Sequence, residues 1–419
     1  MTYLDKPAGG RLTGRRPLAL VVLLLISAAV QGYYEPRPVI RMSDVLTSQQ
    51  AQSLYHRVED IELSGKFYDF RVHSDMGTYN ISSMAMFRKR VEEISTLSQA
   101  MNQVRDDDRG LSSELQGQFS IRADSAIDII SRPVESAADL AGQFADNLEE
   151  TLTGQSRRTT SGTASYLVQE SSDPVAAMHK RNIASQWGLD VYSSNLNVQQ
   201  FLNSITRARS GGKISAGTPT LRSQIRRPPK AADVQVESTT AYLLKSKGVR
   251  ELQQVNRQLL ESMNVNEPTI DRFLNQSVFS PRHQTRICHY LDAIKGLKNR
   301  GAFVEAALAA EDEVMALAFD ESAMMLKHYH EEIGGLNKLN AGDEVLEAVG
   351  NDRRIAYFVP VDMIYWSEET EALFDSLQKR AMQSGFSSWE LVTAGRLTPE
   401  ARKQLQQRKF VVRETFVDR

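Results

Sequence analysis

The sequence predicts a mainly helical α+β protein with a central antiparallel helical bundle, an N-terminal β-hairpin and a small C-terminal three-stranded α/β module. Apolar residues recur at helical spacing through residues 242–333, and the links between these helical segments are short. Aromatic and β-branched residues at 67–72 and 78–81 flank a turn, which is typical of a hairpin. Beyond residue 354, short apolar runs alternate with helical segments, which indicates a parallel sheet with helical crossovers.

Length and composition are those of a globular protein. The chain has 419 residues, of which 41% are hydrophobic and 24% charged, enough for two or three domains with packed cores. The formal net charge of −2 provides no overall attraction to nucleic acid or anionic membrane. Cys288 is the only cysteine, so no intrachain disulfide forms, and its place in an amphipathic pattern favours a buried apolar role over a reactive thiol.

The N-terminus has the form of an export signal. Arg15 and Arg16 precede an apolar run of about 13 to 14 residues, and small residues follow it. This run is shorter than the roughly 17 to 25 residues that a membrane-spanning helix needs. We therefore expect a signal peptide over residues 1–32, cleaved between Gly32 and Tyr33, and a periplasmic or secreted protein. The alternative is a protein anchored in the membrane by an uncleaved N-terminal segment.

The mature chain divides into four parts by pattern. Residues 33–153 contain a short helix over 48–59, the hairpin and amphipathic helices. Within these helices, a sequence pattern recurs every eleven residues over 125–152. Residues 154–173 are rich in Ser, Thr and Gly and read as a linker. Residues 174–335 form the predicted bundle, whose longest helix covers 302–333, and residues 336–419 form the α/β module. Expected helix N-caps are Ser280, Ser367 and Thr398.

A basic loop over residues 207–232 interrupts the bundle. Its basic patch consists of Arg222, Arg226, Arg227 and Lys230, and glycines and prolines oppose regular structure there. In an exported protein such a patch would contact an envelope protein, anionic lipid or an acidic polysaccharide, unless the loop is merely solvated. Nucleic acid is disfavoured as a partner, because no aromatic residues lie between the charges.

One metal site is conceivable on the 302–333 helix. His328 and Glu332 lie four residues apart on one helix face, and Glu321 falls on the same inward stripe as His328. The competing interpretation is a structural pair of histidine and glutamate. Neither Glu-x-x-His nor His-Glu-x-x-His occurs in the chain, so the di-iron bundle motif and the helical zinc motif are both excluded.

A ligand site is conceivable at one edge of the C-terminal sheet. Ligands of open parallel sheets bind beyond the carboxyl ends of the strands. Asp362 follows the first predicted strand, and Thr393 and Arg396 follow the second. A carboxylate, a hydroxyl and a guanidinium would suit a polar ligand, but they would equally suit a network of turn contacts.

No catalytic template fits the chain. It has no Gly-x-Ser-x-Gly elbow, and residues 211–215 lack the upstream glycine and the hydroxyl residue of a phosphate loop. No family resemblance suggests an activity or a cofactor. We therefore expect a non-catalytic binding or scaffolding protein of the cell envelope. The alternative is an extracytoplasmic hydrolase, metal-dependent at His328 and Glu321 or built on Asp362 and Arg396.

Overall fold

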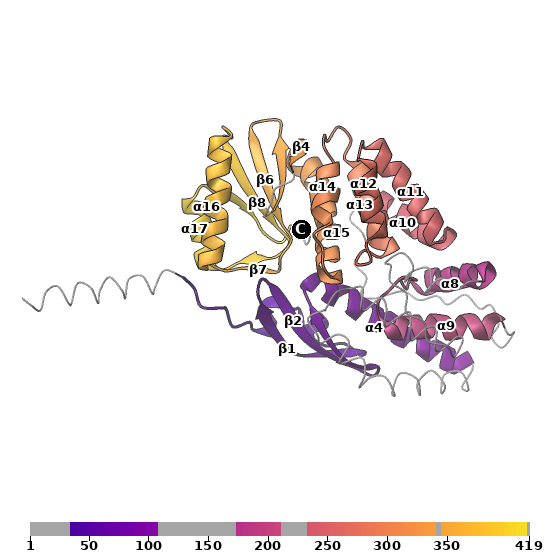
Figure 1. Ribbon diagram of the computed structural model, residues 1–419. Coiled ribbons are helices and arrows are strands. Elements are labelled where there is room, and N and C mark those ends of the chain that lie inside the picture. The colour runs from indigo at the N-terminus through magenta and orange to yellow at the C-terminus, as the bar shows by residue number, and fades with distance from the viewer. Residues whose placement is uncertain (1–33, 108–172, 211–232, 341–344, 417–419) are drawn as a thin grey trace, which may run out of the picture.

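The computed structural model describes residues 34–107, 173–210, 233–340 and 345–416. Over these residues the fold is mixed α/β, with a three-stranded antiparallel sheet near the N-terminus and a second sheet near the C-terminus (Figure 1). The expected signal peptide, the eleven-residue repeat, residues 154–172 of the expected linker and all four residues of the basic patch lie outside the described residues.

The N-terminal sheet contains one strand more than the predicted hairpin. Its strands, in spatial order, are β1 (His56–Ser64), β2 (Phe67–Ser74) and β3 (Gly77–Ser82). The pair β2–β3 confirms the hairpin, whereas the helix expected over 48–59 is wrong. Within that range only α3 (Ser48–Ala51) is helical, and α2 (Met42–Val45) precedes it. Strand β1 follows, because Val58, Ile61 and Leu63 share its buried face.

A long helix, α4 (Met84–Asp107), packs against this sheet. The rings of Phe70 on β2 and Phe87 on α4 stack with their centroids 4.3 Å apart. The same hydrophobic cluster includes residues of α8 (Pro174–Trp187) and α9 (Leu196–Ser210). Helices from either side of the expected linker therefore share one core.

The remaining central helices belong largely to a second hydrophobic cluster. They are α10 (Val234–Ser246), α11 (Val249–Ser262), α12 (Glu267–Asn275), α13 (Pro281–Ala293), α14 (Gly301–Ala307) and α15 (Glu313–His328), followed by the π-helical turn η1 (Tyr329–Ile333). Helices α8 and α9 pack in the first cluster and α12 to α14 in the second, whereas α10, α11 and α15 contribute buried residues to both, and the predicted single antiparallel bundle is not confirmed. The continuous helix predicted over 302–333 is wrong, because the Asp312 side chain accepts a hydrogen bond from Met315 N and starts a new helix.

The C-terminal sheet is larger than predicted. Its order is β10 (Phe410–Arg413), β8 (Ser388–Thr393), β6 (Arg354–Val359), β5 (Leu346–Gly350) and β4 (Leu336–Asn340). The three predicted strands are the parallel ones, β6, β8 and β10, and the prediction of only three strands is wrong because β5 and β4 add antiparallel to β6. Two further short strands, β7 (Met363–Ile364) and β9 (Arg396–Leu397), pair in parallel beside it.

Helices and loops cover the C-terminal sheet on both faces. One face packs with α16 (Glu368–Gln383) and α17 (Pro399–Gln407), which begin at the predicted caps Ser367 and Thr398. The other face packs into the second cluster, where the ring of Tyr329 on η1 meets that of Phe358 on β6. Figure 1 shows this module beside α14 and α15 and above the N-terminal sheet.

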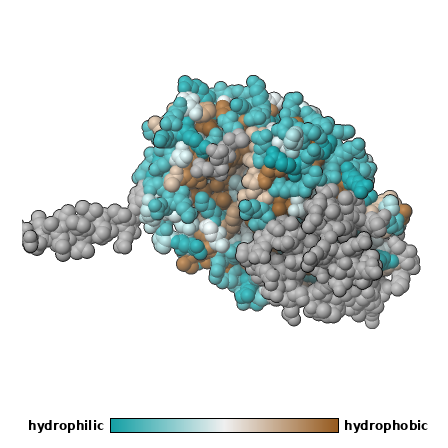
Figure 2. Space-filling view, viewed as in Figure 1, coloured by the Kyte–Doolittle hydropathy of each residue, from teal (hydrophilic) through white to brown (hydrophobic). Residues whose placement is uncertain are grey.

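The surface is mainly polar. On the face drawn in Figure 2, apolar residues gather between the C-terminal module and the neighbouring helices, and hydrophilic residues cover most of the rest that is not grey. Over the described ranges, no helix combines the length and the apolar character needed to cross a bilayer.

Candidate functional site

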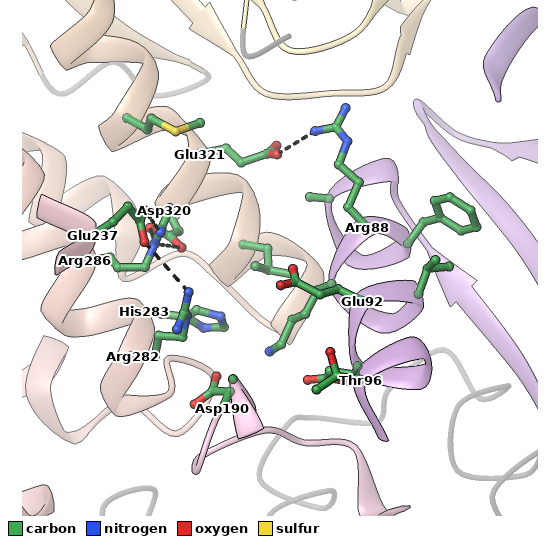
Figure 3. A pocket seen from close by; sticks show the side chains of 18 of the residues that line it. Arg88, Glu92, Thr96, Asp190, Glu237, Arg282, His283, Arg286, Asp320 and Glu321 are labelled. Atoms are coloured by element: carbon green, nitrogen blue, oxygen red, sulfur yellow. Dashed lines mark hydrogen bonds and ion pairs between the residues drawn. The ribbon is translucent and has the colours of Figure 1, made fainter. Parts of the chain in front are cut away.

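A cleft of about 600 Å³ lies where α4 faces α13 and α15 (Figure 3). Further lining residues come from α3, from α10 and from the connection between α8 and α9. Side chains of both charges line the walls. The acidic ones are Glu92, Glu93, Asp190, Asp233, Glu237, Asp320 and Glu321, and the basic ones are Arg88, Lys89, Arg282 and Arg286.

Helix α13 supplies one wall of this cleft. Ser280 caps the helix through its side chain, which accepts a hydrogen bond from His283 N, and Pro281 occupies the first turn. Arg282 and Arg286 are four residues apart, so both project from one face of α13. Arg286 Nε donates to both carboxylate oxygens of Asp320, at 2.9 and 2.8 Å.

Arg286 is the centre of a buried charge network. Its Nη1 donates to Glu237, which also accepts from the hydroxyl of Tyr290 at 3.1 Å. Burial alone would lower the pKa of Arg286, but Asp320 and Glu237 raise it well above the usual arginine value. Burial raises the pKa of Asp320, although the Arg286 guanidinium opposes the rise. The guanidinium is therefore charged at every physiological pH and holds α10, α13 and α15 together.

Helix α4 supplies the opposite wall. Lys89 Nζ lies 2.7 Å from Glu313 Oε1, and Arg90 Nη2 lies 3.2 Å from Glu313 Oε2. Arg90 also pairs with Glu93 at 2.7 Å. Burial alone would raise the pKa of Glu313, but Lys89 and Arg90 lower it well below the usual glutamate value. Glu313 therefore stays ionised and ties the first turn of α15 to α4.

His283 stands apart from these paired groups. Its side chain is 1% exposed and lines the cleft, and within the described part of the chain neither ring nitrogen has a hydrogen-bond partner. Burial, followed by the positive charge of Lys89, lowers the pKa of His283 well below the usual histidine value. The ring is therefore neutral, with one N–H donor and one acceptor nitrogen, both buried at the cleft wall and unbonded within the described residues.

Asp190 presents a second unsatisfied group. Its Oδ1 accepts a hydrogen bond from Tyr192 N at 3.0 Å, which fixes the side chain at the connection between α8 and α9. Its Oδ2 is buried, and among the described residues it has no partner. Asp190 and His283 line the same cleft, so their unsatisfied atoms are available to the same occupant.

The residues of the predicted metal site have other partners. Glu321 Oε1 lies 3.4 Å from Arg88 Nη1 across the cleft, a contact drawn in Figure 3. His328 Nε2 lies 2.8 and 2.9 Å from the two carboxylate oxygens of Asp233, and Glu332 is exposed on η1. In the described ranges no three His, Cys, Asp or Glu side chains are grouped so that they could hold a metal ion. His328 therefore pairs with an aspartate, Asp233, and not with a glutamate as in the structural alternative.

The residues of the predicted sheet-edge site meet at a junction between the two ends of the chain. Asp362 Oδ2 accepts hydrogen bonds from Tyr68 N on β2 and Met84 N at the start of α4, both at 2.9 Å. Burial raises the pKa of Asp362 to about 6, although these two N–H donors oppose the rise. The distant carboxylate thereby caps α4, where the helix dipole favours negative charge.

The other two predicted residues make turn contacts at the same place. Arg396 N donates to Asp362 O at 3.0 Å, and Arg396 Nη1 donates to Asp44 O at 2.6 Å. Thr393 is fully buried, and its hydroxyl accepts from Gly395 N at 3.3 Å. A Cβ at Gly395 would lie 2.0 Å from Asp362 O, so only glycine fits this turn. The three residues therefore come close together, but the side chains of Asp362 and Arg396 bond to backbone groups at positions 44, 68 and 84, far away in the sequence.

The cleft and its two unsatisfied groups were not predicted from the sequence. His283 follows a predicted helix start, and Lys89 and Arg90 lie inside the predicted amphipathic helix 84–101, so each element was visible in the sequence. A run of charged residues, Arg88, Lys89 and Arg90, beside the apolar stripe of α4 is the one local signal that could have indicated the cleft. No protein-family model, curated protein or solved structure matches this chain.

Proposed function

We propose that this chain is an exported, non-catalytic binding protein that holds a small polar molecule in the cleft between α4, α13 and α15. The observation that carries the proposal is His283, a buried neutral imidazole facing the cleft without a hydrogen-bond partner in the described residues. Leaving a buried polar group unbonded costs about 1 to 3 kcal/mol. A ligand that donates to one ring nitrogen and accepts from the other would recover this free energy.

The size and construction of the cleft support a small ligand. Its volume of about 600 Å³ falls within the range of roughly 300 to 1,000 Å³ that is usual for small-molecule sites. Most of its charged side chains already have ion-pair partners, such as Arg286 with Asp320 and Lys89 with Glu313. A ligand would therefore enter a site whose walls are held in place before binding, which lowers the entropic cost of association.

Export is the part of the proposal that rests on sequence. Arg15 and Arg16, followed by a short apolar run, are typical of a secretory signal. Mass spectrometry of the mature protein from its natural source should find Tyr33 as the N-terminal residue. A protein retained with residues 1–32 in the membrane fraction would support the anchored alternative, and an intact soluble cytosolic chain would contradict both.

Binding has more support than the hydrolase alternative. A cysteine nucleophile would need an accessible thiolate, but burial raises the pKa of Cys288 and its side chain does not line the cleft. The pairs on which the hydrolase was expected to depend, His328 with Glu321 and Asp362 with Arg396, have their side chains engaged elsewhere in the protein.

Thermal unfolding with a panel of small polar molecules tests the binding function. Amino acids, sugars, polyols and nucleosides should include at least one class that raises Tm. A ligand at 100 times its Kd adds about 2.7 kcal/mol to stability, which corresponds to several degrees. His283→Leu should abolish the shift, whereas His289→Leu, on the same helix but outside the cleft lining, should keep it. A panel with no stabilising molecule, or equal shifts in both variants, would overturn the proposal.

A further inference from the structure

The charges around the two unsatisfied groups indicate the ligand's chemical class, an inference that rests on the binding function proposed above. We propose that the cleft binds a zwitterion, a free amino acid or short peptide, with its carboxylate at Arg282 and His283 and its ammonium group at Asp190. These three residues line one cleft. Figure 3 shows Arg282 and His283 on the α13 side and Asp190 at the lower end as drawn.

The carboxylate end is indicated by the cationic side chains that line the cleft around His283. Three cations, Lys89, Arg282 and Arg286, lie close enough to lower its pKa, and among the main contributions only Glu313 acts in the opposite direction. The neutral ring also offers one N–H donor to an anionic oxygen. A cationic group placed against His283 would instead be repelled by these neighbours.

Arg282 is the cation best placed to bind that carboxylate. Its contact with Glu237 is 4.0 Å long, whereas Lys89 and Arg286 lie 2.7 and 2.8 Å from their carboxylate partners. Its side chain is 28% exposed, so its guanidinium remains accessible from the cleft. A planar guanidinium binds a carboxylate through two parallel hydrogen bonds. Arg282 therefore has the geometry to take the negative end of the ligand.

The ammonium end is indicated by Asp190. Its Oδ2 is a buried anionic acceptor that has no partner in the described ranges, and its Oδ1 is already used by Tyr192 N. An ammonium group carries three donors and would satisfy Oδ2 with a charge-assisted hydrogen bond. Acidic residues also outnumber basic ones in the cleft lining by seven to four, which disfavours a ligand that is only anionic.

The two ends together select a ligand with both charges. A purely anionic ligand would leave Asp190 unsatisfied, and a purely cationic one would face the cations around His283. The cleft volume of about 600 Å³ accommodates a single amino acid or a short peptide.

Calorimetric titration of the full chain with the twenty standard amino acids and a set of dipeptides tests this ligand class and separates its two sources. The tightest binder is then compared with its N-acetyl and carboxamide derivatives, each of which lacks one charge. Both derivatives should bind at least tenfold more weakly than the zwitterion. Equal affinity of the zwitterion and either derivative would overturn the assignment of that end.

Two variants assign each end to its residue. Asp190→Asn keeps the acceptor for Tyr192 N. It should lower the affinity for the zwitterion tenfold or more, without changing the affinity for the N-acetyl derivative. Arg282→Gln should likewise lower the affinity for the zwitterion tenfold or more, without changing the affinity for the carboxamide derivative. Matched controls outside the lining are Asp271→Asn, which alters one ion pair, and Arg257→Gln, which alters two, and both should leave the zwitterion's affinity unchanged.

The outcome separates this inference from the function on which it rests. Binding of a polyol, sugar or nucleoside that requires His283, with no binding of any zwitterion, would overturn the ligand class and leave the binding function standing. The absence of binding by every molecule of the wider panel would overturn both.

Discussion

Glu313, the ion-pair partner of Lys89 behind the cleft lining, and Asp362 at the sheet junction are both largely buried carboxylates, yet their surroundings shift their pKa values in opposite directions. Glu313 lies against Lys89 and Arg90, and its pKa falls well below the usual glutamate value. Asp362 accepts only backbone N–H groups through Oδ2, and burial raises its pKa to about 6. Formal cations compensate a buried negative charge, whereas two amide dipoles do so only in part.

The same contrast separates two histidines. His328 is 1% exposed and lies within hydrogen-bond distance of Asp233, whereas His283, equally buried, has no partner in the described residues. A buried polar group with a protein partner contributes to the fold, and one without a partner is available to a ligand. Burial alone thus identifies neither a structural nor a functional residue.

The largest expected effect is at Glu313. Glu313→Gln would leave Lys89 and Arg90 buried beside a neutral side chain, and breaking a buried ion pair in this way costs about 3 to 5 kcal/mol. Urea unfolding of the variant and the parent protein would measure the loss. Glu311→Gln, at an exposed position two residues earlier, should change stability by less than about 0.5 kcal/mol. Similar losses for both variants would show that the network does not depend on the charge of Glu313.

Removal of the Asp362 carboxylate should cost less. Asp362→Ala leaves Tyr68 N and Met84 N without an acceptor, at a cost of about 2 to 3 kcal/mol in the same unfolding experiment. Asp362→Asn keeps an acceptor oxygen for both donors and should cost under about 1 kcal/mol. If the asparagine variant lost as much stability as the alanine variant, the negative charge of Asp362 itself would stabilise the junction. That result would contradict a role for Asp362 as a mere hydrogen-bond acceptor.

Stability should respond to pH differently at the two carboxylates. The folded-state pKa of Asp362, about 6, exceeds its usual value of 3.8, so the folded protein binds a proton first as pH falls. Relative to the Asp362→Asn variant, the free energy of unfolding of the parent protein should therefore rise by about 2 kcal/mol as the pH falls from 7 to 4. Glu313 has a lowered pKa, so its contribution should stay constant down to about pH 4.5 and decline only below that. A flat profile at Asp362 would contradict a raised pKa there.

Removal of either histidine should change stability, and the change should differ in sign between the two. His283→Leu replaces an unbonded buried imidazole with an apolar side chain and should stabilise the ligand-free protein by about 1 kcal/mol. His328→Leu leaves the Asp233 carboxylate buried without its partner and should destabilise the protein. Thermal unfolding of the ligand-free variants would measure both. Destabilisation by His283→Leu would assign that histidine a structural role.

Local signals predicted the local structure. Ser280, Ser367 and Thr398 begin helices as their spacing indicated, and the apolar runs at 355–359, 389–392 and 410–412 are parallel strands. Strand β1 was missed because Glu59, Asp60 and Glu62 mask its alternation, which a register shift between Val58 and Asp60 also interrupts. Strands β4 and β5 were missed because each is only five residues long. They become recognisable as strands only through the pairing of β4 with β5 and of β5 with β6.

The site was less predictable because distance along the chain separates its members. Lys89 on α4, Asp190 between α8 and α9, and His283 on α13 meet only in the folded protein. Sheet-edge geometry did single out Asp362, and the structure places it at a junction of segments, but its partners at 68 and 84 have no local signal near residue 362. Rules of residue spacing apply within one helix or strand, whereas these contacts join different helices and strands, so spacing could not predict them.

The contact between Asp362 and Tyr68 has a consequence for biosynthesis. Tyr68 leaves the ribosome 294 residues before the carboxylate that completes its hydrogen bond. At about 5 to 20 residues per second, this is a delay of roughly 15 to 60 seconds, during which the nascent N-terminal sheet and the first turn of α4 lack their acceptor. The N-terminal third of the protein therefore completes its fold only when translation is nearly finished, which leaves it open to chaperones and, if it is exported, to the translocation machinery.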